Sequence, residues 1–351
     1  MDFNIHNLIK IHVDGTQKRT LNYFCRDYFH FTTVEPTEPD IEVIISDFVP
    51  DIDNCYLVNH KYYIKDDSIF CKDTHKVVKW KVYIKALSEK KTIVYFSGTK
   101  FSEVFLRDCI IEPIIALKLA LKGFVFLHAS GIAMHGKGFV FPACKGVGKT
   151  STLLNLAGQG VFLGNDKVII SSDGYVYSYP TLVHIFGYNL KDMPHAFRLL
   201  SKRQRMETQI KRAIKKLSFE YASLPLDIDP QLIWGQLGNS YPLQSVILLS
   251  KSTKTDIKIL EHDNKEEFIK RLTIINRYEM DYFENLLLAY SFIYPNSIMN
   301  IDQYWQTCRD ILTKTLENTR CLEVEIPKIY TTDTYHKIFE LLKSSYLEHN
   351  K

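Results

Sequence analysis

Phe139-Val140-Phe141-Pro142-Ala143-Cys144-Lys145-Gly146-Val147-Gly148-Lys149-Thr150-Ser151 is the stretch on which the fold prediction rests. It begins with an apolar strand, continues through a glycine-rich turn, and leads into a helix whose apolar residues are leucines. Residues 143–150 match the pattern of a phosphate-binding loop, G-x-x-x-x-G-K-[ST] between a strand and a helix, with alanine in place of the first glycine. We therefore predict an α/β fold with a phosphate-loop core and a mixed β-sheet.

The chemistry of such a loop depends on its backbone and on two side chains. Glycines let consecutive N–H groups turn toward one point, and the start of the helix adds its dipole and its unpaired N–H groups. Lys149 can reach the β- and γ-phosphates, and the Thr150 hydroxyl can ligate Mg²⁺. The expected cofactors are ATP and Mg²⁺. The expected nucleotide-binding residues are Lys145, Gly146, Val147, Gly148, Lys149, Thr150 and Ser151.

Ala143 is the departure from the pattern. Alanine is the smallest replacement for glycine, but it carries a cost if the position requires a positive φ. The alternative interpretation is a glycine-rich turn in an ordinary strand–helix unit. The Gly-x-Gly-Lys-Thr sequence in this context favours nucleotide binding over that alternative.

A phosphoryl-transfer site also requires a carboxylate for the metal, usually at the end of a neighbouring strand. Asp166 lies sixteen residues after Thr150, at a break in an apolar strand. That separation corresponds to about one helix and one strand, as adjacent elements of a phosphate-loop fold require. We predict that Thr150 and Asp166 hold the metal. The alternative is an aspartate in a turn between strands.

Four stretches of the sequence resemble the catalytic core of HPr kinase/phosphorylase and its kinase relatives, which share a fold with ATP-dependent phosphoenolpyruvate carboxykinase. The stretches are residues 127–133, 138–141, 145–152 and 161–166. The likeness extends weakly to residues 246–249 and 321–326. The first hundred residues and the segment 187–240 show no such resemblance.

The resemblance implies roles for individual residues. Lys149 would hold the transferred phosphate, and Thr150 and Asp166 would hold Mg²⁺. The family usually has two adjacent aspartates where this chain has Asn165-Asp166, and one of the two is thought to act as the general base on the acceptor hydroxyl. Asn165 cannot accept a proton, so either Asp166 serves both roles or His128, which matches a family histidine, acts as the base.

His128 ends an apolar strand, and the alternative interpretation is a core histidine with satisfied hydrogen bonds. In the resemblance, a further acidic residue of the true HPr kinases falls near His184. These departures argue against HPr itself as the substrate. The predicted catalytic residues are thus Asp166, His128 and Lys149.

The sequence predicts two domains. Residues 1–100 form a smaller β-rich N-terminal domain, with strands expected at 41–45, 80–84 and 92–96. Residues 101–351 form the HPr kinase-like catalytic domain, which contains a mostly helical, basic insertion at 187–240. Eight basic residues between 198 and 216 indicate either a solvated helical face or a mobile lid that contacts phosphate or an acidic peptide.

Composition limits the partners. The 44 basic and 40 acidic residues give a net charge of +4, so charge alone indicates neither a nucleic-acid nor a membrane partner. Seven dispersed cysteines are typical of reduced thiols, and the N-terminus has no signal-peptide pattern. The expected location is the cytoplasm. The expected partners are a nucleotide and a hydroxyl-bearing acceptor, and oligomer formation is left open.

The function that the sequence predicts is an ATP- and Mg²⁺-dependent phosphotransferase, a kinase that acts on a hydroxyl, with a serine of a peptide or protein as the expected acceptor. Two alternatives are a kinase for a small metabolite and a nucleotide-binding regulatory protein without catalytic activity. The second alternative rests on Asn165 and Ala143.

Overall fold

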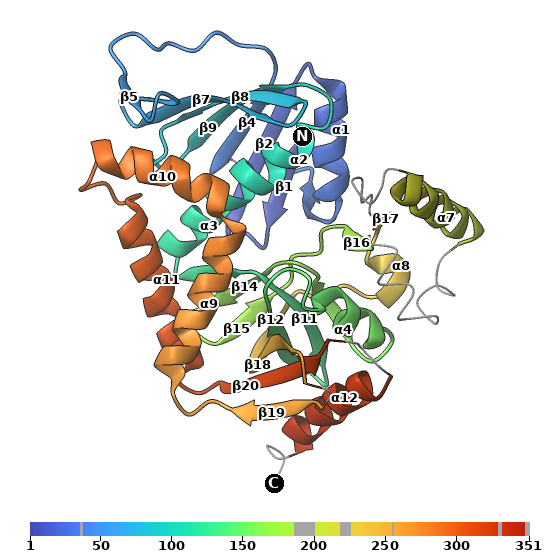
Figure 1. Cartoon of the computed structure of the whole chain (residues 1–351). Helices are drawn as coiled ribbons and strands as arrows, with labels where there is room; N and C mark the ends of the chain where they lie inside the picture. The colour runs from blue at the N-terminus through green and yellow to red at the C-terminus, as the bar shows by residue number, and fades with distance from the viewer. Residues whose placement is uncertain (36–37, 186–200, 218–225, 255, 329–331, 348–351) are drawn as a thin grey trace. The chain divides into compact units, whose positions relative to one another are not determined.

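The computed structural model (Figure 1) describes residues 1–35, 38–185, 201–217, 226–254, 256–328 and 332–347. The chain has a mixed α/β fold and divides into two compact units. Unit 1 comprises Met1–Phe126 and Asn276–Leu312, and unit 2 comprises Leu127–Ile275 and Thr313–Lys351. The expected N-terminal domain of residues 1–100 lies within unit 1. The division between the units does not coincide with the expected boundary at residue 100, because unit 1 also takes in residues 101–126 and 276–312.

Unit 1 is built on a nine-stranded sheet with both parallel and antiparallel pairs. The central strands β2, β4 and β9 are parallel, and the strands on either side are antiparallel. In spatial order the strands are β3 (Thr32–Thr33), β1 (Asp2–Ile5), β2 (Ile9–Gly15), β4 (Ile41–Ile45), β9 (Thr92–Gly98), β8 (Val78–Lys85), β7 (Ser68–His75), β6 (Tyr62–Lys65) and β5 (Tyr56–Val58).

Side chains alternate along β1, β2, β4, β6, β8 and β9 between a buried inner face and a partly exposed outer face. In β8, Trp80, Val82 and Ile84 are buried, whereas the residues between them are partly exposed. The expected strands at 41–45, 80–84 and 92–96 are therefore confirmed. The helices of unit 1 are α1 (Lys18–Asp27), the 3₁₀ turn η1 (Phe29–Phe31), α2 (Glu103–Leu106), the π-helical turn η2 (Arg107–Ile111), α3 (Glu112–Leu121), α10 (Asp281–Ile293) and most of α11 (Ile301–Leu316).

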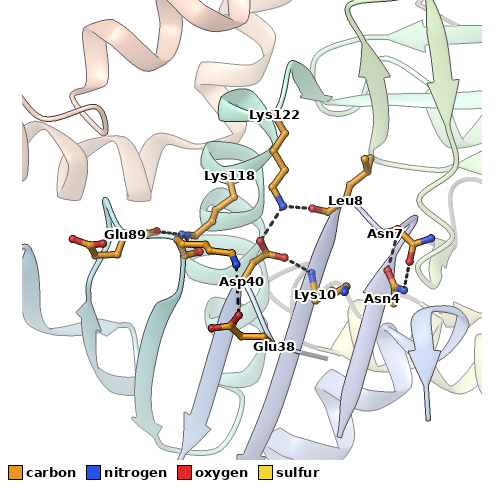
Figure 2. Close-up of polar contacts among 10 residues, drawn as sticks. Asn4, Asn7, Leu8, Lys10, Glu38, Asp40, Glu89, Lys118 and Lys122 are labelled. Atoms are coloured by element: carbon orange, nitrogen blue, oxygen red, sulfur yellow. Dashed lines mark hydrogen bonds and ion pairs between the residues drawn. The ribbon is translucent and has the colours of Figure 1, made fainter. Parts of the chain in front are cut away.

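Lys118 of α3 and Lys122, which follows the last residue of the helix, attach this helix to the sheet (Figure 2). The ammonium group of Lys118 is buried and donates to the carbonyl oxygens of Glu89 (2.6 Å) and Lys90 (3.1 Å). Burial lowers the pKa of Lys118 to about 8. Lys122 bridges the Leu8 carbonyl and the Asp40 carboxylate. These contacts attach α3 to the first hundred residues of the chain.

Unit 2 is built on a second nine-stranded mixed sheet. Strand β12 is antiparallel to β11 and parallel to β18, and β18 is parallel to β20. The strands are β10 (Phe124–Leu127), β11 (Ala129–Met134), β12 (Lys137–Pro142), β13 (Val161–Gly164), β14 (Val168–Ser171), β15 (Tyr175–Tyr177), β18 (Ser240–Ser252), β19 (Lys258–Glu261) and β20 (Arg320–Pro327), with a separate pair formed by β16 (Val183–Ile185) and β17 (Leu226–Ile228). Of these, β10 begins in unit 1 and reaches unit 2 at Leu127.

One apolar cluster forms the core beside β12. It joins Phe139 and Phe141 of β12 to Leu153 and Leu154 of the helix that follows, and to side chains of β16, β17, β18 and β20. The predicted mixed sheet is confirmed. Within the described residues, the helices of unit 2 are α4 (Lys149–Asn155), α7 (Lys202–Leu217), α8 (Gln231–Trp234), α9 (Lys265–Glu279) and α12 (Thr332–Leu347), of which α9 continues into unit 1.

Helices α9 and α10 are separate, because Met280 leaves the helical conformation between them. The basic insertion lies partly outside the described residues, which exclude 186–200 and 218–225. Its described part contains α7, where Lys211 pairs with Glu207 at 2.7 Å. No helix within the described ranges has the length and apolar character needed to cross a membrane.

Candidate functional site

The glycine-rich turn at residues 143–148 connects β12 to α4. Residues 144–146 are exposed, and residues 147 and 148 are partly exposed. Gly146 and Gly148 have φ values of 78° and 125°, which side-chain-bearing residues rarely adopt. A Cβ atom on Gly146 would meet nothing within 4 Å, so backbone conformation rather than space requires glycine there. Ala143 is buried and does not have a positive φ. Alanine at this position is therefore free of the conformational cost considered above.

Lys149, the first residue of α4, extends back across the turn. Its ammonium group donates to the Ala143 carbonyl at 2.6 Å and contacts Nε2 of His128 at 2.7 Å. The Lys149 side chain is buried. An ammonium group only donates hydrogen bonds, so Nε2 of His128 is the acceptor and the ring proton lies on Nδ1. The sequence predicted both residues for the site, and the fold brings them into contact.

The surroundings of His128 decide its charge. Burial, and then the positive charges of Lys149, Lys167 and Lys145, lower the pKa of His128 well below its usual value. The imidazole is therefore neutral near pH 7 and is a weak base. In this arrangement His128 orients the Lys149 ammonium group through Nε2. A role as general base for His128 is disfavoured, because the atom that would take the proton already accepts a hydrogen bond.

Asp166 and Asn165 lie beside His128. The Ala129 N–H donates to the Asp166 carbonyl at 3.1 Å, and β11 pairs with β13 in the register Gly131 to Gly164. Continuing this register by one residue brings Asn165 opposite Ser130. Asp166 is partly exposed, whereas Asn165 is only 2% exposed. The backbone thus brings the predicted metal ligand next to the residue that contacts Lys149.

Asn165 has an unusual environment for a buried amide. Neither its side-chain oxygen nor its nitrogen has a hydrogen-bond partner among the residues that the structure describes. The buried hydroxyl groups of Ser130 and Thr152 are in the same condition within those ranges. Buried polar groups are nearly always hydrogen bonded, to ordered water or a ligand where the protein supplies no partner. The sequence indicated Asn165 only as a departure, and Ser130 and Thr152 carried no signal.

The remaining predicted residues differ in exposure. Lys145 and Gly146 are exposed, Val147, Gly148 and Thr150 are partly exposed, and Ser151 is buried. Across the described part of the chain, no group of three or more His, Cys, Asp or Glu side chains could hold a metal ion. A cation held by Thr150 and Asp166 would therefore need oxygen ligands from water or from a bound phosphate. That ligand set suits Mg²⁺, which commonly keeps waters and shares substrate phosphates.

His184 lies in β16, and the resemblance implies an acidic residue near this position. Its Nδ1 atom contacts the carboxylate of Asp227 in β17 at 2.9 Å. The flanking residues Val183 and Ile185 belong to the same apolar cluster as α4. A carboxylate is therefore present at β17, although it comes from a different strand than the resemblance implied.

Comparison of the sequence with known protein-family models, and with curated proteins, finds no match. The functional interpretation consequently depends on the arrangement of the residues described above.

Proposed function

We propose that this protein binds ATP with Mg²⁺ at residues 143–151 and transfers the terminal phosphate to a hydroxyl group, with a serine of a peptide or protein as the acceptor class. In this proposal unit 2 has a phosphate-loop core of the HPr kinase type. The observation that carries the proposal is the Lys149 ammonium group, which is buried against the Ala143 carbonyl and His128 at the start of α4.

A phosphate would take over these contacts. Gly146 and Gly148 allow the turn to direct N–H groups toward an anion, and Lys149 would exchange the Ala143 carbonyl for a phosphate oxygen. His128 would keep Lys149 in position from the other side. Thr150 and Asp166 would hold Mg²⁺, which neutralises charge on the transferred phosphate. Phosphoryl transfer relies mainly on positioning and electrostatic stabilisation, so a strong general base is not essential.

The same geometry supports one alternative function, a nucleotide-binding regulatory protein. The observation that favours it is the neutral pair Asn165 and His128, neither of which is an effective base. A small-metabolite kinase differs from the main proposal only in its acceptor.

The proposal predicts the behaviour of Lys149→Ala. Removing one charged donor aimed at the phosphate should lower the rate of phosphate transfer about 10²–10³-fold, while the far-ultraviolet circular dichroism spectrum stays the same. The measurement uses γ-labelled ATP with a library of serine-containing peptides, and calorimetry for ATP binding with and without Mg²⁺.

Lys137→Ala is the matched control, because Lys137 begins β12 at the opposite end of the strand. Its rate should equal that of the wild type. Equal rates for Lys149→Ala and the wild type would refute the proposed site. Tight, Mg²⁺-dependent ATP binding without transfer to any acceptor would favour the regulatory alternative.

A further inference from the structure

We propose that the outer face of the unit 1 sheet binds an acidic, extended segment of a partner polypeptide. The face is formed by alternate residues of β7, β8 and β9. It carries a group of lysines, here called the lysine row: Lys79, Lys81 and Lys85 of β8, and Lys72 of β7. The proposal concerns unit 1 alone and does not depend on phosphate transfer.

The lysine row has an excess of positive charge. Lys81 pairs with Asp47 at 2.5 Å. Within the described residues, Lys72, Lys79 and Lys85 have no acidic partner within 4 Å. Lys72 also lies directly opposite Lys81 on the neighbouring strand, an arrangement of like charges that destabilises a sheet. An anionic partner would relieve this repulsion.

The spacing of the lysine row fits an extended peptide. Residues that share one face of a strand are about 6.8 Å apart, so the row from Lys79 to Lys85 spans about 20 Å. An extended chain with an acidic side chain at every second residue has the same repeat. A single small anion would contact only one or two of these lysines, whereas such a segment would contact the whole row.

A cavity of about 840 Å³ lies at one end of the row. Three lysines of the row line it, together with the carboxylates of Asp47 and Asp73. Its remaining lining residues are Gln17, Thr74, Trp80, Ser97, Gly98 and Thr99. Asp47 pairs with Lys81 and Asp73 pairs with Lys61, outside the row. The parallel strands β2, β4 and β9 also end here, at Gly15, Ile45 and Gly98. Ligands of open sheets with parallel strands commonly bind beyond the carboxyl ends of those strands. The cavity would hold one end of the peptide.

The aromatic side chains on this face argue for a peptide and against a single-stranded nucleic acid. Bases need exposed rings for stacking. Here Phe70 is buried, and the Lys85 ammonium group lies 5.0 Å from the ring centre of Tyr83 and 5.6 Å from that of Tyr95. The Phe48 ring packs against Phe70 and Tyr95, and the Lys81 ammonium group lies over the Phe48 ring. The rings therefore support the lysines and are not open for stacking.

The test measures binding of a fluorescein-labelled peptide, Glu-Ser repeated four times, to the full chain by fluorescence anisotropy. Binding should weaken as salt rises. Lys72→Ala, Lys79→Ala and Lys85→Ala should each weaken binding about two- to fivefold, and the triple variant should weaken it more than tenfold. Lys90→Ala, which removes an exposed lysine of the same unit, is the matched control and should bind like the wild type.

A second peptide contains the same residues with all the glutamates in one block. It should bind more weakly, because its charges do not follow the repeat of the strand. Unchanged binding of the triple variant would overturn the proposal. So would tighter binding of an eight-nucleotide oligothymidine or of phosphatidylserine vesicles than of the alternating peptide. Lys149→Ala should bind the peptide normally, which separates this proposal from the proposed kinase activity.

Discussion

At the scale of single residues, side-chain and backbone hydrogen bonds bring the candidate site residues together. His128 accepts a hydrogen bond from Lys149, and Lys149 also donates to Ala143. The residue after His128 bonds the backbone of Asp166. The phosphate-loop motif predicted Lys149, and the need for a carboxylate that binds the metal predicted Asp166. It did not predict the contact between His128 and Lys149, because that contact depends on how β11 and β12 pair.

The pair Asn165 and Asp166 provides a prediction at this scale. Asp166 is the only carboxylate among the site residues that the sequence predicted. Asp166→Asn should therefore lower the rate of phosphate transfer about 10²–10⁴-fold. Asn165→Asp should be tolerated and should accelerate transfer, because the carboxylate keeps the size of the amide and can accept a proton. The measurement is the initial rate of phosphate transfer against pH for the wild type and both variants.

The dependence of the Asn165→Asp transfer rate on pH should show an additional ionising group that is absent from the wild type. Wild-type rates and an unchanged Mg²⁺ requirement in Asp166→Asn would mean that Asp166 is only a turn residue. In that case the metal site would have to be sought elsewhere.

At the scale of elements, an ion pair ties helix α9 to strand β20. Arg271 donates two hydrogen bonds of 2.6 Å to the Glu323 carboxylate, which His262 also contacts at 3.0 Å. The hydrogen bonds from Arg271 lower the pKa of Glu323 to about 2, despite its burial. Strand β20 pairs with the central strand β18, so this contact anchors the helix to the middle of the sheet.

This contact predicts how stability depends on pH. The pKa of Glu323 is lower in the folded protein than in the unfolded chain, so its stabilising effect is complete above about pH 4.5 and is lost as the pH falls toward 2. Arg271→Gln should lower the free energy of unfolding by about 1.5–3 kcal/mol at pH 7. The loss should become smaller below pH 4.5. Urea unfolding at several pH values measures both effects.

Arg320→Gln serves as the control, since Arg320 pairs with the more exposed Glu261 at 2.9 Å. It should cost less than about 1 kcal/mol. A cost for Arg271→Gln that stays constant from pH 7 to pH 2 would contradict the assignment to the Glu323 charge.

Elements differ in how well the sequence predicted them. Strand β4 was predicted because its Ile-Glu-Val-Ile-Ile sequence is strongly β-forming and places alternate apolar residues on one face. Helix α1 was missed, because only Thr20, Phe24 and Asp27 of its ten residues are buried. Asp27 pairs with Arg107, eighty positions away, at 2.5 Å. The sequence around a helix does not reveal stabilisation by a residue so far along the chain.

At the scale of the whole molecule, unit 1 is made from two separate parts of the chain. Residues 1–126 supply the sheet, and residues 276–312 supply helix α10 and most of α11. The indole of Trp80 donates to the Tyr282 hydroxyl at 3.3 Å, and the Tyr290 hydroxyl donates to Asp67. The sequence could not predict this return of the chain, because the boundary at residue 100 was inferred from a change in local pattern.

The two-part construction predicts that residues 1–126 do not fold stably alone. They would lack four buried side chains of α10, namely Phe283, Leu286, Leu287 and Tyr290. Each contributes about 1.5–3 kcal/mol when buried, and together they are comparable to the stability of a typical domain, about 5–15 kcal/mol. Joining residues 276–312 to residue 126 through a flexible linker should restore cooperative thermal unfolding, measured by circular dichroism. A cooperative transition in residues 1–126 alone would refute this expectation.

The return of the chain to unit 1 also sets an order of events during synthesis on the ribosome. The strands of residues 1–98 emerge first, but the helices that complete unit 1 follow only after a further segment of about 150 residues. At roughly 5–20 residues per second, that interval is on the order of 10–30 s. Throughout this time the apolar inner face of the first sheet lacks α10. The nascent chain should therefore be a client of ribosome-associated chaperones until residue 312 has left the exit tunnel.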